Sequence, residues 1–315
     1  MLIFHIHKLY SIERWIQMKL LIFGSGVIGS FYALYFLKAG YQVTMYARNN
    51  RFHQLLSNGL VYQERKTIKK LNVNVIDTLR DNDIYDFIFV TVKSDQIYDA
   101  LRQLKNNRSK TLVTMVNTVD TYQTWENICG YNRILPAFPG AGGSIDEEGI
   151  LRAYLTPSYI QKTTFGELHS KKSQRLNILK DIFKTSRIPY DIVDNMHLWQ
   201  ICHLALVVPL ANVYYAVEKS KYAGYNYSIL SNAVDELKYN LSQVQSIYNR
   251  LIPKKMYYIL YLPKTFIIFV LFILYNSSFG SRFMYPHSIK ARKEMKYLEN
   301  RLHYLFNKNR SSIDN

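Results

Sequence analysis

The first half of the chain alternates short apolar runs with segments of helical periodicity. Continuous apolar runs of the kind found in a parallel sheet covered on both faces stand at residues 86–92 and 111–116, and further strands are predicted over 19–23, 41–46, 133–138 and 159–168. The strand predicted over 19–23 is followed by a helical segment from Ser30 that Gly40 ends. This alternation of strand and helix is typical of an α/β domain built on a parallel sheet.

From about Asp194 long helical patterns replace the short strands. We predict helices over residues 196–217, with Pro209 inside, over 227–250, and from Pro286 to about 306. The fold class expected is therefore α/β, with an N-terminal Rossmann domain followed by an all-helical domain. The expected divisions are an extension over 1–17, a nucleotide-binding domain over 18–193 and a helical substrate-binding or dimerisation domain over 194–315.

A glycine-rich turn joins the first strand to the first helix. Its sequence is Gly24-Ser25-Gly26-Val27-Ile28-Gly29. In this setting G-x-G-x-x-G is the dinucleotide fingerprint: the first glycine permits a tight turn, the second admits a pyrophosphate and the third allows close helix–strand packing. The pyrophosphate would lie on the helix N-terminus. We predict that these six residues bind a cofactor; the alternative is a purely structural glycine turn.

The end of the second strand indicates which dinucleotide is bound. An NAD site usually carries Asp or Glu about 20 residues after the fingerprint, to accept a hydrogen bond from the ribose 2′-hydroxyl. Here Arg48 occupies that place, with Arg51 nearby. A guanidinium suits a 2′-phosphate, so we predict NADP. The alternative is a solvated arginine in a turn.

Three further strand ends carry candidate residues, because ligands of open α/β sheets gather at the carboxyl ends of the strands. Lys93 could reach the nicotinamide ribose or a substrate carboxylate, or be a capping lysine on the surface. Asn117 could hold the carboxamide or the substrate, or form a turn. The segment 138–143 could offer backbone N–H groups to an anion, or be a close-packed turn.

Composition changes this interpretation little. The chain of 315 residues has a net charge of +17, from 40 Lys and Arg against 23 Asp and Glu. The basic residues are scattered and no nucleic-acid motif occurs, so no nucleic-acid partner is expected. Cys129 and Cys202 form neither a disulfide framework nor a metal motif. We therefore expect a cytoplasmic protein without a metal site.

Two segments bear on targeting. Residues 1–17 lack the order of a signal peptide and precede Met18, which is an alternative start. The segment from Met256 to Tyr275 has an apolar core of ten residues, from Phe266 to Tyr275, interrupted upstream by Pro263 and Lys264. Because a spanning helix needs about 20 apolar residues, we predict a buried helix here. Peripheral contact with a membrane surface is the alternative.

Several of these residues together resemble the ketopantoate reductase family. The resemblance rests on the fingerprint, Arg48, the sequence Val92-Lys93-Ser94-Asp95-Gln96, Asn117 and the helical second half. A branch of that family carries further motifs that also occur in this sequence. In the first half they are FPGAGG at 138–143 and TFGEL at 164–168, and in the second half they are Trp199-x-x-x-His203, Ser281-Arg282-Phe283 and the run from His287 to Met295. The resemblance covers roughly residues 18–306. It implies NADP-dependent reduction of a 2-keto acid in the cytoplasm, with Lys93 and Asn117 facing cofactor and substrate.

The sequence departs from the family pattern at three positions. The catalytic lysine expected two residues after Trp199 is Ile201, an asparagine four residues further on is Ala205, and the glycine after Asn117 is Thr118. Two rival functions follow from the sequence. One is an NADP-binding sensor without turnover, and the other is a protein of the membrane surface.

Reduction of a carbonyl also needs a proton donor, and two helices offer candidates. At about 100° per residue Trp199, His203, Leu206 and Leu210 share one stripe, which predicts that His203 faces the buried side of its helix. His287 and Glu294 share the inward stripe of the last predicted helix with Ala291, Leu298 and Leu305. We predict that His203, Glu294 and His287 line the substrate side. The alternative for His203 is a core histidine whose hydrogen bonds are satisfied inside the protein. The alternative for His287 is a residue that merely begins a helix, and the alternative for Glu294 is a structural ion pair with Arg282 or Arg292.

Overall fold

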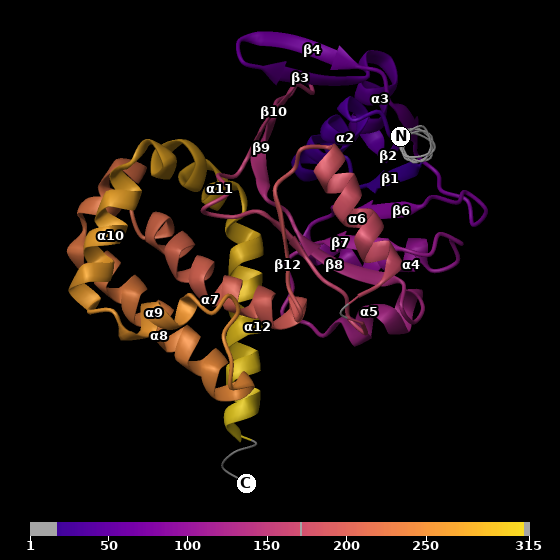
Figure 1. The fold of residues 1–315 in the computed structure, drawn as a ribbon. Coiled ribbons are helices and arrows are strands. Elements are labelled where there is room, and N and C mark those ends of the chain that lie inside the picture. Colours follow the sequence, from indigo (N-terminus) through magenta and orange to yellow (C-terminus); the bar gives the residue numbers. More distant parts are fainter. Residues whose placement is uncertain (1–17, 171, 312–315) are drawn as a thin grey trace, which may run out of the picture. The chain divides into compact units, whose positions relative to one another are not determined.

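The computed structural model describes residues 18–170 and 172–311, so the predicted extension over 1–17 lies outside the described residues. The chain forms two compact units (Figure 1). The first holds the described residues up to Val116 together with Tyr122–Met196, and the second holds Asn117–Thr121 together with His197 and the residues that follow it.

The first unit is built on an eight-stranded sheet. Its strands are β1 (Lys19–Phe23), β2 (Gln42–Tyr46), β5 (Asn74–Ile76), β6 (Phe87–Val90), β7 (Leu112–Met115), β8 (Ile134–Phe138), β11 (Thr163–Phe165) and β12 (Tyr190–Ile192). They lie in the order β12-β11-β8-β7-β6-β1-β2-β5, and every neighbouring pair is parallel except β8 and β11. The chain passes from β1 to β2 on one side and continues with β6 on the other. The strand order therefore reverses beside β1, which is where open α/β sheets bind ligands.

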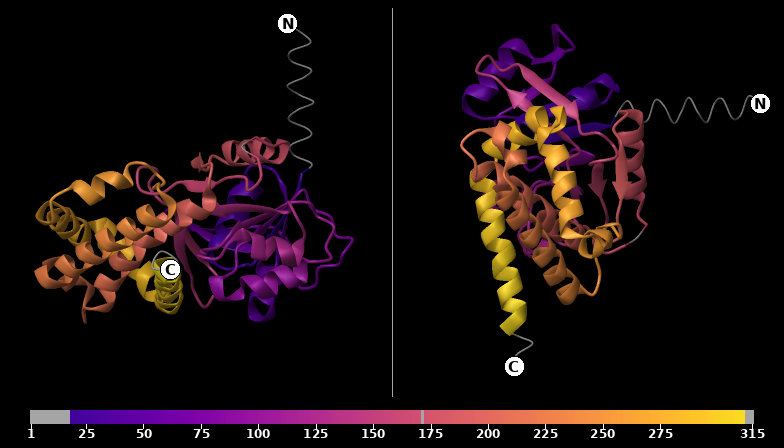
Figure 2. Two further views of the ribbon diagram at one scale, coloured as in Figure 1. Left: turned by 90° about the horizontal axis from the view of Figure 1, so that it is seen from below. Right: turned by 90° about the vertical axis from the view of Figure 1, so that its left-hand side faces the viewer.

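Helices cover both faces of this sheet. They are α2 (Val27–Lys38), α3 (Asn49–Asn58), α4 (Ile97–Leu104), which follows the 3₁₀ turn η1 (Ser94–Gln96), α5 (Tyr122–Cys129) and α6 (Gln174–Thr185). The left panel of Figure 2 shows α6 on one side of the sheet and the α4–α5 pair on the other. The side chains of α2 and α6 meet over β6, where Phe36 and Phe89 lie 4.8 Å apart between ring centroids.

A second, four-stranded sheet was not evident from the sequence. It consists of β3 (Leu60–Glu64), β4 (Thr67–Leu71), β9 (Ala141–Ile145) and β10 (Leu151–Leu155), in the order β4-β3-β10-β9. Helix α2 packs against β9 and β10 as well as against β1 and β2. Because α2 is covered on both sides, Phe31, Tyr32 and Phe36 are all fully buried, and this helix has no polar face.

The strand predicted over residues 159–168 is shorter than expected. Only Thr163–Phe165 form β11, and Tyr159 is 82% exposed. The reason is local: the N–H of Ile160 donates to the carbonyl of Pro157 at 2.8 Å, so the chain turns before the strand begins.

In its described part the second unit contains helices and connecting loops but no strand, which confirms the predicted fold class. Its helices are α7 (Met196–Tyr215), the 3₁₀ segment η2 (Ser220–Tyr225), α8 (Tyr227–Tyr248), α9 (Met256–Tyr261), α10 (Lys264–Asn276), the π-helical segment η3 (Gly280–Met284), α11 (Tyr285–Lys290) and α12 (Arg292–Ser311). By length and composition α7 could cross a membrane, but 67% of its most apolar window is buried inside the protein. Figure 1 shows α7 inside the ring formed by the other helices, so it is a core helix.

Two helices expected from the sequence are interrupted. The helix predicted from Pro286 is divided by a turn at Ala291 into α11 and α12, and it extends to Ser311. The segment 256–275 is divided into α9 and α10, because Pro263 favours an extended residue before it and Leu262 has ψ 142°. The prediction that this segment is a buried helix is wrong for its outer face, since Phe269 is 58% exposed.

Candidate functional site

The glycine-rich turn lies at the carboxyl end of β1, an inner strand of the eight-stranded sheet. Gly24 follows the strand with φ +117°, and Gly26 is the N-terminal cap of α2. Thr91, just beyond β6, fixes the turn: its N–H donates to the carbonyl of Phe23 at 2.9 Å and its hydroxyl donates to that of Gly24 at 2.7 Å. The sequence analysis missed Thr91, whose only signal was its place after an apolar strand.

The three glycines of the fingerprint differ in what surrounds them. A Cβ on Gly29 would lie 1.9 Å from the carbonyl oxygen of Gly24, and one on Gly24 would lie 2.9 Å from that of Thr91. A Cβ on Gly26 would have no heavy atom of the described residues within 4 Å. Its φ of −72° is also open to any residue. The fold therefore requires glycine at positions 24 and 29, whereas at Gly26 the missing side chain leaves open space.

The first turn of α2 offers that space backbone donors that the helix itself leaves without an acceptor. Intrahelical bonding begins with the N–H of Ser30, which donates to the carbonyl of Gly26 at 2.9 Å. The N–H groups of Val27, Ile28 and Gly29 therefore have no acceptor within the helix. The first turn contains no acidic residue. These amides and the helix dipole favour an anion at this point.

The remaining fingerprint residue, Ser25, is buried and holds the turn in place. Its carbonyl accepts hydrogen bonds from the hydroxyl of Ser30 and from Nε of Arg51, both at 3.2 Å. Nη1 of Arg51 also donates to the carbonyl of Gly149 at 3.1 Å, and burial lowers the pKa of this guanidinium. Arg51 was expected near the 2′-phosphate, but its guanidinium is used inside the protein.

Arg48 lies two residues beyond β2, which is the neighbour of β1. It is the N-terminal cap of α3, and its side chain is exposed. Residues 41–63 contain no Asp or Glu. The first carboxylate near this edge is the exposed Asp77, which follows β5. Arg48 is therefore the charged side chain that stands where a ribose-binding carboxylate would otherwise be found.

The structure brings Lys93 to the same edge, on the other side of β1. Lys93 follows β6, caps η1 and is exposed. Asn117 follows β7 by two residues, is half-buried and belongs to the second unit. Beside it, the N–H of Thr118 donates to Oε1 of Gln200 at 2.9 Å. The strands thus gather Gly24, Arg48 and Lys93 at one sheet edge, while Asn117 is grouped with the helices.

Within the segment 138–143 only Pro139 and Gly140 lie outside the strands, in a close-packed connection between β8 and β9. The N–H of Gly140 donates to the hydroxyls of Tyr32 at 3.2 Å and of Thr163 at 3.3 Å. A Cβ on Gly140 would lie 2.4 Å from the backbone nitrogen of Thr163. Because this N–H already has acceptors, the alternative of an anion site at Gly140 is wrong.

A cavity of about 760 Å³ lies at the opposite edge of the sheet. The first residues of three strands, Lys19, Gln42 and Asn74, are among those that line it. It is therefore separate from the glycine turn, which lies at the carboxyl ends of the strands.

On α7, His203 is half-buried and its ring stacks on that of Trp199, with centroids 5.1 Å apart and planes 8° from parallel. The predicted stripe is only partly buried, because Leu206 and Leu210 are also half-buried. The fully buried side of α7 carries Ile201 and Ala205, which replace the lysine and asparagine of the family pattern. The prediction that His203 faces the buried side of its helix is therefore confirmed only in part: its ring lies against the buried Trp199, but the side chain itself is half-buried.

The break at Ala291 separates the two candidates of the last predicted helix. His287 lies in α11, and its side chain is outside the described residues. Glu294 is half-buried in the first turn of α12. The guanidinium of Arg292 lies over the ring of Tyr215, 5.1 Å from its centroid. The turn at Ala291 therefore interrupts the predicted helix between the two candidates, and the prediction for the side chain of His287 lies outside the described residues.

The helical unit also contains a buried polar cluster that the sequence analysis missed. Nδ2 of Asn212 donates to Oε1 of Glu299 at 2.8 Å. Burial and the nearby Glu299 raise the pKa of the Glu236 carboxyl. Asn240 is fully buried, and both polar atoms of its side chain lack a partner among the described residues. The only signal in the sequence was polar residues within helices that are otherwise largely apolar.

The glycine turn, the switch in strand order and the helical second unit define a dinucleotide-binding α/β protein. Residues 20–169 match the model of the family described as ketopantoate reductase PanE/ApbA. This part of the chain, slightly less than half of it, therefore matches the ketopantoate reductase family, which confirms the resemblance seen in the sequence. A search of curated proteins finds no match.

Solved structures share the fold over most of the chain. A PanE/ApbA family ketopantoate reductase from Ralstonia eutropha JMP134 is 14% identical, with a TM-score of 0.64 over 91% of this chain and 100% of its own. The 2-dehydropantoate 2-reductase from Methylococcus capsulatus is 16% identical, with a TM-score of 0.61 over 90% and 98%. D-mandelate dehydrogenase with NADH and anilino(oxo)acetate is 14% identical, with a TM-score of 0.61 over 92% and 99%.

Proposed function

We propose that the protein is an NADP-dependent reductase that converts a 2-keto acid, or a related carbonyl compound, into the hydroxy compound. One observation carries the proposal: the space in front of Gly26 is open, although no contact within the protein requires a glycine there. The free N–H groups of Val27 and Ile28 border that space. A pyrophosphate is the group that such a site accepts.

The names of similar structures support the substrate class. 2-Dehydropantoate is a 2-keto acid and mandelate is a 2-hydroxy acid, and the second of these structures holds NADH. In the proposed site Lys93 faces the nicotinamide half of the cofactor or a substrate carboxylate, and Asn117 the carboxamide or the substrate. The cytoplasm is the proposed location, since both cysteines are buried free thiols.

Arg48 supports NADP rather than NAD. We expect Arg48→Ala to weaken NADPH binding by about tenfold or more, because it removes a charge-assisted hydrogen bond to the 2′-phosphate. Binding of NADH, which lacks that phosphate, should stay within a factor of about two. Fluorescence titration of the nicotinamide measures both affinities.

Arg108→Ala is the matched control, since Arg108 is an exposed arginine before β7 at the opposite edge of the sheet. It should leave both affinities unchanged. If Arg48→Ala weakened NADH as much as NADPH, or if the wild type preferred NADH, the assignment of the 2′-phosphate to Arg48 would be wrong.

When bound, the cofactor supplies a hydride, and the protein must orient the carbonyl and protonate its oxygen. His203 is our first candidate for the proton donor, because histidine exchanges a proton near neutral pH and the ring is held against Trp199 while remaining half-exposed. Glu294 and His287 are the further candidates. The buried apolar side chains of Ile201 and Ala205 cannot take this role.

We expect His203→Ala to lower kcat by about a hundredfold at saturating cofactor and substrate, as loss of a general acid does. The affinity for NADPH should not change. The assay follows NADPH oxidation with a panel of 2-keto acids that includes 2-dehydropantoate and benzoylformate. His53→Ala, at an exposed histidine of α3, is the control and should keep the wild-type kcat. An unchanged kcat in His203→Ala would remove His203 from the chemistry.

The same panel separates the reductase from the NADP-binding sensor suggested by Ile201 and Ala205. A reductase oxidises NADPH with at least one keto acid of the panel. A protein that binds NADPH tightly and turns over none of them would fit the sensor instead.

A further inference from the structure

The outward side of α10 is apolar, whereas a surface helix of a soluble protein has a polar outer side. The inner side packs on α8 and η2 and buries Ile267, Ile268, Leu271 and Tyr275. On the outer side large apolar residues are between 38% and 58% exposed: Phe266, Phe269, Val270, Phe272 and Ile273. We call these five residues the α10 face. A helix that is apolar all round is covered by something other than water.

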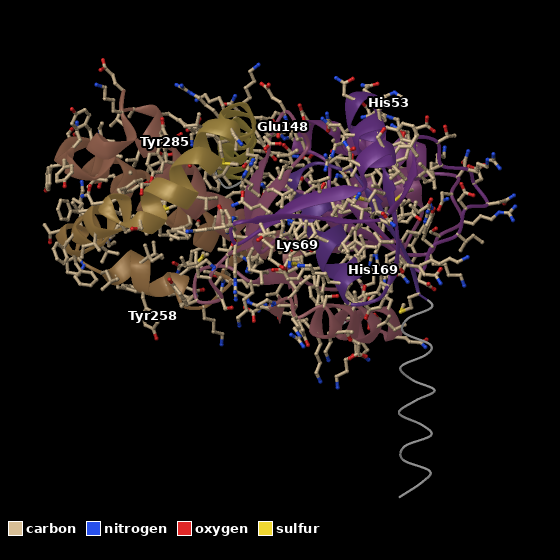
Figure 3. The ribbon with its side chains drawn as sticks, turned by 90° about the horizontal axis from the view of Figure 1, so that it is seen from above. His53, Lys69, Glu148, His169, Tyr258 and Tyr285 are labelled. Atoms are coloured by element: carbon tan, nitrogen blue, oxygen red, sulfur yellow. The ribbon has the colours of Figure 1, made fainter. Side chains whose placement is uncertain are left out.

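Exposed tyrosines flank the α10 face. Tyr225 of η2 is 68% exposed, and its ring meets that of Phe272 edge-on with centroids 5.6 Å apart. On α9, which directly precedes α10, Tyr258 and Tyr261 are 71% and 76% exposed. Figure 3 shows Tyr258 on the surface of the helical unit. Tyrosines of this kind are enriched at the level of lipid headgroups.

The segment of chain that carries this face has charged residues of one sign, although Asp235 of the neighbouring α8 pairs with one of its lysines. Residues 237–293 contain no Asp or Glu and nine basic residues: Lys238, Arg250, Lys254, Lys255, Lys264, Arg282, Lys290, Arg292 and Lys293. Lys238 is used within the protein, where it donates to the carbonyls of Leu260 and Leu262, and Lys264 pairs with Asp235 at 2.5 Å. Lys254 and Lys255 are exposed at the start of α9. An anionic surface complements this charge.

We propose that the α10 face binds the surface of an anionic phospholipid bilayer, with α10 lying in the plane of the headgroups. Its 13 residues extend over about 20 Å, which is too short for a hydrocarbon core of about 30 Å. Aromatic and aliphatic side chains on one side, with lysines beside them, are the pattern of helices that lie in the interface. This proposal does not depend on the reductase function.

A second copy of the chain is the rival occupant, and the charge argues against it. A symmetric contact through the α10 face would bring together two segments that each carry nine basic and no acidic residues. Like charges placed against each other oppose association, whereas an anionic lipid supplies the opposite sign.

Flotation of the full chain with vesicles tests the proposal. The wild type should float with vesicles of equal parts phosphatidylglycerol and phosphatidylcholine, and much less with phosphatidylcholine alone. Phe269→Ser combined with Ile273→Ser should lower the bound fraction at least about tenfold, because it removes two apolar side chains from the lipid. The matched control combines Tyr159→Ser with Ile84→Ser, one exposed aromatic and one exposed isoleucine of the other unit, and should bind like the wild type.

A variant that combines Lys254→Gln with Lys255→Gln measures the electrostatic contribution to vesicle binding separately from the apolar contribution. Two lysines near an anionic surface account for about thirtyfold in binding. This loss should appear at low salt and shrink at high salt. NADPH affinity and thermal unfolding should stay unchanged in all these variants, so a failure of this proposal is distinct from a failure of the reductase function.

Three results would overturn the proposal. One is a wild type that does not float with the anionic vesicles. Another is a Phe269→Ser/Ile273→Ser variant that floats like the wild type. The third is a wild-type dimer in light scattering that this variant dissociates, without any flotation, which would make the α10 face a contact between two copies.

Discussion

A protein that carries Gly29→Ala should unfold at a much lower temperature than one that carries Gly26→Ala. The Cβ at position 29 would lie 1.9 Å from the carbonyl oxygen of Gly24 and 2.6 Å from the hydroxyl of Thr91. The first contact is with backbone, which cannot rotate away, so α2 would have to move off β1. We expect a loss of more than about 3 kcal/mol in the free energy of unfolding, beyond ordinary overpacking. Circular dichroism during thermal unfolding measures it.

Gly26→Ala should separate binding from folding. The Cβ meets no described atom within 4 Å, and φ is −72°. Alanine is a weaker N-terminal cap than glycine, which lowers stability, but it also reduces the conformational entropy of the unfolded chain, which raises stability. These two effects nearly cancel, so the free energy of unfolding should change by less than about 1 kcal/mol. The methyl group would displace a pyrophosphate by an ångström or more, which should weaken NADPH binding about a hundredfold. If Gly26→Ala binds NADPH like the wild type, the pyrophosphate does not lie there.

Arg175→Ala should destabilise the first unit more than any change of a surface charge. Arg175 holds the carboxylate of Glu167 with two hydrogen bonds, Nε to Oε1 at 2.8 Å and Nη2 to Oε2 at 2.6 Å. Glu167 is only 7% exposed, so the variant leaves a buried carboxylate without its ion-pair partner. The expected loss is about 3–5 kcal/mol. Arg102→Ala, which breaks an exposed pair with Asp99, is the control and should cost less than about 1 kcal/mol.

The pH dependence of this loss follows from the sign of the pKa shift. Burial raises the pKa of Glu167, but hydrogen bonds from Arg175 and Ser173 outweigh it, and the pKa in the folded protein lies below 4.5. The stabilisation is therefore complete above the unfolded value of 4.5 and is lost as the pH falls through the folded value. Urea unfolding at neutral and acid pH should show the wild type and Arg175→Ala converging in acid. An equal difference at both pH values would contradict this role.

The parallel sheet was predictable because its strands are buried on both faces. Ile22, Phe89 and Val113 stand in continuous apolar runs, which leave little choice of element. The second sheet escaped prediction because its strands are partly solvated. In β4 the sequence TIKKL is mostly exposed, and in β9 Gly142 and Gly143 carry no side chain to show a pattern. These strands are defined by their partners rather than by their own composition.

The candidate site also has one part that the sequence predicts and another part that it does not. The roles of Gly24 and Gly29 follow from a local turn, and the sequence fully specifies such a turn. The role of Arg51 could not be predicted, because its acceptor Gly149 lies 98 residues away in the chain. The turn at Ala291, between α11 and α12, gave no glycine or proline signal of its own. Long-range hydrogen bonds and helix breaks of this kind depend on tertiary contacts.

Calorimetric titration of the wild-type protein with NADPH tests the central claim most directly. We predict saturable binding at one site per chain, tighter than the binding of NADH. A protein that is folded by circular dichroism and shows no measurable affinity for NADPH would contradict the assignment of the glycine turn and Arg48 to a phosphorylated dinucleotide.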